Sequence, residues 1–137
     1  MLIEFPIEFV VHGTPVSLQA KRPAAKTEWK ERVKDASRTV LPEGHFASEE
    51  RITVTMFYLP EEPMQGDIDN IVKPILDALK QHIFIDDSQV NRLVVQKFEP
   101  GNVFSFQNPT NTFAKALEGD KPVLYIRLTN DPHEELR

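Results

Sequence analysis

The stretch GDIDNIVKPILDALKQHIFIDDSQVNRLVVQK, residues 66–97, combines a helix pattern with a strand pattern. Apolar residues spaced for one helical face run from about Asn70 to Gln81: Ile71, Val72, Ile75, Leu76 and Leu79. Asp69 or Asn70 is expected to cap this helix, and Pro74 fits only near its start, because a proline further inside costs a backbone hydrogen bond. Residues 90–98 are β-branched and apolar enough for a central strand.

Three further strands are expected on either side of this stretch. Apolar residues alternate with mostly polar ones over residues 3–11, a run that Gly13-Thr14-Pro15 ends, and again over residues 52–58. Residues 122–129 complete the set, and an amphipathic helix is expected from about residue 27 to a stop before Pro42, with Trp29, Val33, Ala36 and Val40 inward. The predicted fold class is α+β, a two-layer sandwich in which a small mixed β-sheet of about four strands packs with two main helices.

The composition limits the number of domains, the location of the protein and the atoms that can bind a metal. With 137 residues, 40% of them hydrophobic and 27% charged, the chain is expected to form a single domain over residues 1–137, with residues 130–137 as a polar tail. No apolar run is long enough for a membrane span, and Glu4, Pro6 and Glu8 interrupt the place of a signal peptide, so we expect a soluble, cytoplasmic protein with no membrane partner. The absence of cysteine and the four scattered histidines leave oxygen as the expected ligand atom for any metal.

Charge is segregated along the chain. The net charge is −5, yet residues 17–40 carry seven basic and three acidic side chains, which makes this stretch +4 and the remainder −9. Two interpretations are open at this point: a solvated helix face with mixed charges, or a surface that contacts a polyanion.

Five aspartates fall within 21 residues: Asp67, Asp69, Asp77, Asp86 and Asp87. In an extended backbone Asp67 and Asp69 would point the same way, and a tight connection would bring Asp86 and Asp87 back to the same end of the sheet. Carboxylates about 4 Å apart repel by roughly 4 kcal/mol at an effective dielectric near 20, so a converging set binds protons or a cation. The hard cation Mg²⁺ suits an all-oxygen set.

Lys73 lies one helical turn after Asp69 and is placed to stabilise charge that develops during phosphate chemistry. The alternative interpretation is structural: Asp69 or Asn70 caps the helix, Asp77 pairs with Lys73 or Lys80, and Asp86-Asp87 are turn residues. An EF-hand is excluded because DIDNIVKPILDA lacks the required glycine, and a D-x-D sugar-nucleotide site is disfavoured by the short chain.

The joint spacing of D-x-D-N-x-x-K, D-A-L and D-D-x-Q-V resembles that of the RusA-type Holliday junction resolvases, and a weaker likeness extends over VHGTPVSLQAKRP, residues 11–23, and the last strand. The resemblance implies a Mg²⁺-dependent endodeoxyribonuclease of DNA recombination and repair, with Mn²⁺ as a possible substitute. It implies a homodimer that nicks two symmetric strands of a four-way DNA junction. By the same likeness Asp67, Asp69 and Asp87 are catalytic metal ligands, Lys73 is the catalytic lysine, and Asp86 is a neighbouring metal ligand.

Further expectations concern DNA contacts. Lys21, Arg22, Lys26 and Lys97 are expected to hold flanking phosphates. The aromatic residues of the loop over residues 101–121 (Phe104, Phe106 and Phe113) form either a wedge that stacks on unpaired bases or part of the core, and core packing is favoured. Two rival functions stay open: a catalytically silent nucleic-acid-binding module of the same fold, and a nuclease for other branched DNA or RNA.

Overall fold

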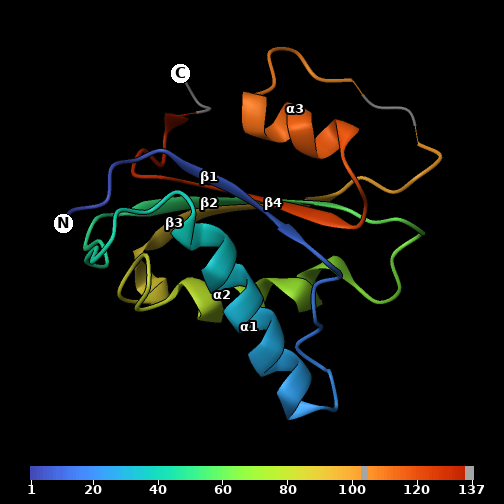
Figure 1. Ribbon diagram of the computed structural model, residues 1–137, viewed down its shortest axis with the longest axis horizontal. Helices are drawn as coiled ribbons and strands as arrows, with labels where there is room; N and C mark the ends of the chain where they lie inside the picture. The colour runs from blue at the N-terminus through green and yellow to red at the C-terminus, as the bar shows by residue number, and fades with distance from the viewer. Residues whose placement is uncertain (103–104, 135–137) are drawn as a thin grey trace.

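The computed structural model describes residues 1–102 and 105–134 and contains a four-stranded mixed sheet (Figure 1). The strands are β1 (Ile7–His12), β2 (Ile52–Leu59), β3 (Val90–Lys97) and β4 (Val123–Thr129), in the spatial order β1-β4-β2-β3. β4 pairs antiparallel with both β1 and β2, whereas β2 and β3 are parallel. The predicted small mixed sheet of about four strands is therefore confirmed.

The central position predicted for residues 90–98 is wrong, because within the described residues β3 is an edge strand that pairs only with β2. None of the residues of β3 is fully buried, and Leu93 is 41% exposed. The last strand, β4, lies with β2 in the interior of the sheet and is buried along almost its whole length. The composition of residues 90–98 could not distinguish the two positions, because apolar β-branched residues suit a half-exposed edge strand as well as a central strand.

Two helical segments cover one face of the sheet: α1 (Pro23–Arg38), and η1 (Ile68–Ile71) continuing into α2 (Val72–Leu79) (Figure 1). Both pack on a core to which β1, β2 and β4 contribute, which confirms the predicted sandwich. α1 begins at Pro23, ahead of the predicted start, because proline is well suited to the first helical turn. Val40 lies beyond the helix and is exposed. None of the helices in the described residues is long and apolar enough to cross a membrane.

A third helix, α3 (Asn111–Glu118), lies on the opposite face and covers one end of the sheet (Figure 1). It adds a partial third layer to the predicted two-layer sandwich. Phe106 and Phe113 join an aromatic cluster with Phe57, Phe98 and Tyr125, with ring centroids 4.8 Å apart for the pair Phe106 and Phe113. Core packing is thus confirmed for these two residues, whereas Phe104 lies outside the described residues.

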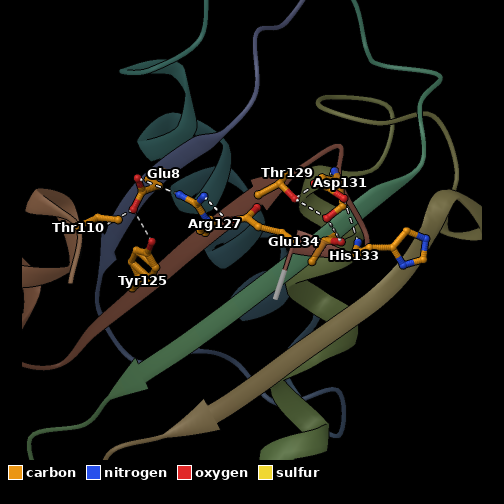
Figure 2. Close-up of polar contacts among 9 residues, drawn as sticks. Glu8, Thr110, Tyr125, Arg127, Thr129, Asp131, His133 and Glu134 are labelled. Carbon is orange, nitrogen blue, oxygen red and sulfur yellow. Dashed lines mark hydrogen bonds and ion pairs between the residues drawn. The ribbon is translucent and has the colours of Figure 1, made fainter. Parts of the chain in front are cut away.

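A polar network holds α3 and the chain end against this second face (Figure 2). The Glu8 carboxylate on β1 accepts hydrogen bonds from Thr110 Oγ1 at 2.6 Å and from the Tyr125 hydroxyl, and it pairs with Arg127 at 3.2 Å. Arg127 also pairs with Glu134 at 2.9 Å. Burial and the nearby Glu8 raise the pKa of Tyr125. Residues 130–134 are therefore tied to β4 by polar contacts, and the assignment of residues 130–137 as a polar tail stays a prediction.

A histidine pair joins α1 to the segment that precedes Asp86. His82 Nε2 lies 2.8 Å from the buried Ser37 Oγ on α1, and His45 Nε2 lies 2.8 Å from the His82 carbonyl. Burial, followed by His45, Arg38 and Lys34, lowers the pKa of His82 to about 4, and Glu31 opposes the shift. The folded state therefore holds this imidazole neutral at pH values where an unfolded chain would protonate it.

Acidification is expected to weaken the fold through His82. When the pH is lowered from about 6.5 to about 4, His82 is protonated in the unfolded chain but stays neutral in the folded protein. The free energy of unfolding therefore decreases over this interval, by about 1–2 kcal/mol for this half-exposed group. Urea unfolding of the wild type and of His82→Gln at pH 7 and pH 4.5 measures the difference. The wild type is expected to lose more stability than the variant over this interval, and equal losses would contradict the assignment.

Candidate active site

The first acidic segment enters α2 through the short helix η1. Asp67 has extended backbone (φ −95°, ψ 145°) and Asp69 is the second residue of η1. Neither η1 nor α2 has a side-chain cap, and Ile71 occupies the N-cap position of α2, so the prediction that Asp69 or Asn70 caps the helix is wrong. Pro74 lies in the first turn of α2, as predicted. The extended backbone assumed for both aspartates is present at Asp67, whereas Asp69 lies in the three-residue turn of η1.

The second acidic segment precedes β3. Val90 pairs in register with Ile52, so the parallel strands β2 and β3 begin side by side. Asp67 lies eight residues after the end of β2, and Asp87 lies three residues before the start of β3. α2 connects the two segments, and its eight residues span only about 12 Å. The expectation that the carboxylates before and after α2 lie at the same end of the sheet stays a prediction.

Lys73 joins the two segments. Its ammonium Nζ lies 2.6 Å from Asp87 Oδ2 and 2.9 Å from Asp77 Oδ1. These two carboxylates, Asp87 before Asp77, raise the pKa of Lys73, so the side chain is fully charged at neutral pH. The predicted pairing of Asp77 with Lys73 is confirmed, and the structure adds Asp87 as a second partner from a distant part of the sequence.

The other oxygen of Asp87 provides a test of the predicted metal. Asp87 Oδ1 is buried and has no hydrogen-bond partner among the residues that the structure describes. An unpaired buried carboxylate oxygen is costly unless it meets a proton or a cation, and oxygen is the ligand that Mg²⁺ prefers. In residues 1–102 and 105–134, however, no three His, Cys, Asp or Glu side chains are grouped closely enough to hold an ion. The ligand chemistry therefore fits Mg²⁺, while a preformed cage is not present in the described residues.

Asp86 has a structural role. Its carboxylate accepts a hydrogen bond from the Ser88 backbone N–H at 3.0 Å, and Gln89 completes a capping box at η2 (Asp87–Gln89). Lys80 Nζ lies 3.5 Å from the same carboxylate. The bond from Ser88, with Lys80 adding to it, lowers the pKa of Asp86. The turn interpretation is thus confirmed for Asp86, and its assignment as a metal ligand stays a prediction.

Gln89 is a residue whose role the sequence pattern did not reveal. Its Oε1 accepts from the backbone N–H groups of Ile85 and Asp86 at 2.8 and 2.9 Å. Its Nε2 donates to the carbonyls of Ser48 and Glu50 at 2.8 and 2.7 Å. Gln89 therefore anchors the turn that carries Asp87 to the segment before β2, and the resemblance motif D-D-x-Q-V was the only signal that could have pointed to it.

The basic segment begins beside the first acidic motif. The backbone N–H of Leu18 donates to the Asn70 carbonyl at 2.7 Å, so Lys21 and Arg22 follow a loop fixed next to η1. Lys21 and Arg22 are exposed, and Lys26 is half-buried on the first turns of α1. Arg22 is paired with Glu28 at 3.8 Å, and towards the other end of α1 Lys34 and Arg38 are paired with Glu31 and Asp35. Acidic side chains on α1 therefore balance part of the positive charge at both of its ends.

Lys97 at the end of β3 pairs with Glu99 at 3.2 Å. Glu99 also accepts a hydrogen bond from the Met64 backbone N–H at 2.7 Å, and this bond, followed by Lys97, lowers the pKa of Glu99. Lys97 therefore lies next to the loop that precedes Asp67, although part of its charge is balanced. Its contact with a phosphate stays a prediction.

Comparison with known proteins identifies the family. The model of a family described as endodeoxyribonuclease RusA matches residues 8–104, which is more than half of the chain. The matched span includes both acidic segments, Lys73 and the basic segment at the start of α1. No curated protein matches the chain significantly. The chain therefore belongs to the RusA endodeoxyribonuclease family, the family of endonucleases that resolve Holliday junctions.

Proposed function

We propose that this protein is a Mg²⁺-dependent nuclease that resolves four-way DNA junctions by paired, symmetric nicks during recombination and repair in the cytoplasm, with Mn²⁺ able to replace Mg²⁺. The observation that carries the proposal is the ion pair between Lys73 and Asp87, because it brings the lysine that lies one helical turn after Asp69 onto an aspartate of the second acidic segment in a RusA family chain. Unpaired Asp87 Oδ1 supports the metal, since this oxygen has no partner within the described protein.

The proposed roles follow from charge and position. Asp67, Asp69 and Asp87 hold the ion, and Asp86 stays a weaker candidate because its carboxylate caps η2. A bound Mg²⁺ or Mn²⁺ supplies Lewis-acid stabilisation of the charge on the phosphate. Lys73 remains protonated and stabilises the oxyanion charge that develops during in-line attack by water. When Asp87 binds the ion, Asp77 continues to hold the Lys73 ammonium in place.

DNA contact and symmetry complete the proposal. Lys21, Arg22 and Lys26 hold phosphates on one side of the cut, and Lys97 holds one on the other side. A homodimer supplies two such sites at a fixed separation, which matches the approximate two-fold symmetry of a four-way junction.

Incubation of end-labelled four-way junctions with the protein tests the proposal. Paired nicks at symmetry-related positions are expected with Mg²⁺ or Mn²⁺, and no cleavage is expected with EDTA. A junction that is bound but uncut would support a silent binding module, and preferential cleavage of flaps, forks or RNA would support the other rival. Sedimentation of the protein measures its mass in solution, which is expected to be that of a homodimer.

Asp77→Asn is expected to lower kcat for junction cleavage about tenfold with little change in KM, because a neutral amide no longer holds the Lys73 ammonium by charge. Single-turnover cleavage over a range of protein concentrations separates the two constants. Asp35→Asn is the matched control, since Asp35 also pairs with a basic residue on its own helix but lies on α1. If Asp77→Asn has the kcat of the wild type, Asp77 does not position the Lys73 ammonium for the reaction.

A further inference from the structure

A groove of about 380 Å³ opens beside Asp67 and is continuous with the proposed active site. Its walls are the loop after β1, the end of β2 with the following loop, and the start of η1. We call it the Asp67 groove and define it by six of its lining residues: Thr14, Ser17, Pro60, Glu62, Met64 and Asn70. No role in the proposed hydrolysis has so far been given to this space.

The walls of the Asp67 groove are fixed by backbone hydrogen bonds. The Leu18 N–H donates to the Asn70 carbonyl at 2.7 Å, which joins the β1 loop to η1. The Gly13 N–H donates to the Pro122 carbonyl at 3.1 Å, and the Phe98 N–H donates to the Tyr58 carbonyl at 2.8 Å. On the opposite side the Met64 N–H is held by Glu99. The cavity is therefore preformed, as ligand sites usually are.

The lining has the chemistry of a nucleobase site. Pro63, Pro122 and Met64 supply exposed apolar surface on which a flat ring can stack, and buried Pro15, Pro60 and Ile71 lie behind them. Carboxylate and amide oxygens, from Glu61, Glu62, Gln65 and Asn70, can accept hydrogen bonds from the exocyclic amino groups of a base. Among the described lining residues none is lysine or arginine, so the groove does not suit a phosphate. Phosphates fit instead at Lys21 and Arg22, which follow the Ser17 wall.

We propose that the Asp67 groove accepts one unstacked nucleobase of the strand being cut, next to the scissile phosphate. The inference rests on the proposed nuclease function, because the groove borders Asp67. Removing a base from its stack is least costly where pairing is already broken, as at the crossover of a junction. Occupancy of the groove would thus select both a branched substrate and the base beside the cut.

A mutant cycle between protein and DNA tests this inference. Junctions are prepared with a single abasic nucleotide at each position near the cut, and cleavage is measured with the wild type and with Thr14→Trp, which fills the groove from an exposed wall position. In the wild type, one abasic position is expected to lower kcat/KM about tenfold, which is the usual size of a base-stacking contribution. On the intact junction, kcat/KM of Thr14→Trp is expected to be lower than that of the wild type by a similar factor. The abasic nucleotide should cause no further loss of kcat/KM in this variant.

Controls separate the possible outcomes. Ser17→Trp fills the same wall from a second position and repeats the cycle if Thr14→Trp does not fold. Val40→Trp adds the same bulk at an exposed site outside the groove and should respond to abasic nucleotides as the wild type does. The proposal would be overturned if the losses in kcat/KM caused by Thr14→Trp and by the abasic nucleotide multiplied when the two changes were combined. It would also be overturned if no abasic position lowered kcat/KM of the wild type.

Binding measurements keep the inference separate from the nuclease proposal. The same cycle is run on Kd in EDTA, where no cleavage is needed. If no junction is cut, the nuclease proposal fails, while coupling in Kd still supports the base site. If junctions are cut normally without coupling in either measurement, only the base site fails.

Discussion

Asp69→Asn is expected to abolish junction cleavage while the fold remains intact. Asp69 is exposed on η1, and its side chain makes no capping hydrogen bond, so the isosteric amide should be tolerated. Loss of one charged ligand removes several kcal/mol of transition-state stabilisation, which is on the order of a 10³-fold loss of rate. Junction binding should be unchanged or tighter, because one negative charge that repels DNA is gone.

Three measurements check the result: single-turnover cleavage with Mg²⁺, junction affinity in EDTA, and the thermal midpoint of unfolding. Asp120→Asn is the matched control, since Asp120 is exposed in the turn between α3 and β4, away from both acidic segments. It should cut at the wild-type rate. Full activity in Asp69→Asn would refute the assignment of Asp69 as a metal ligand.

Phe84→Ala is expected to destabilise the protein by about 3–5 kcal/mol, a large share of the stability of a small domain. Phe84 is fully buried and lies three residues before Asp87. Its carbonyl accepts a hydrogen bond from Gln81, and it forms bridges with Ser48 and Lys80. Loss of the ring therefore leaves a cavity beneath the turn that positions Asp86 and Asp87.

Urea unfolding measures the change in free energy, and cleavage assays at low temperature measure what remains of the site. Phe46→Ala is the control, because the Phe46 side chain is 66% exposed and its removal should cost less than about 0.5 kcal/mol. Cleavage by Phe84→Ala should be reduced even where the variant is folded, since the turn loses its support. A loss of stability below 1 kcal/mol would contradict the role of Phe84 as a central core residue.

Local sequence patterns were sufficient to predict the strands and main helices and the grouping of several charged side chains. The alternation of apolar residues placed β1 and β2, and the apolar, β-branched run over residues 122–129 placed β4. The helical spacing from Ile71 to Leu79 placed α2, because such a pattern reports which face of its own segment is buried. The spacing of Asp69, Lys73 and Asp77 likewise placed three charged groups along one helical entry, since neighbours one turn apart are set by helix geometry alone.

The position of each element relative to the others was beyond these patterns. Residues 90–98 predict a strand whether it is central or at an edge, and only the pairing with β2 decided that β3 is an edge. Only the tertiary structure decided that β2 and β3 pair in parallel and that Lys73 contacts Asp87, 14 residues further along the chain. The β-pattern contains no information on such pairing, because it depends on packing between segments distant in sequence.

The sequence by itself determined the secondary structure, the acidic motifs with their lysine, and the basic stretch at the start of α1, since all of these depend on residues close together in the chain. Only the tertiary structure decided the strand order, the partners of Glu8 and Asp87, and the groove beside Asp67. These features arise where side chains from separate segments meet, and the free energy of such contacts depends on the packing of the whole domain rather than on any local run of residues.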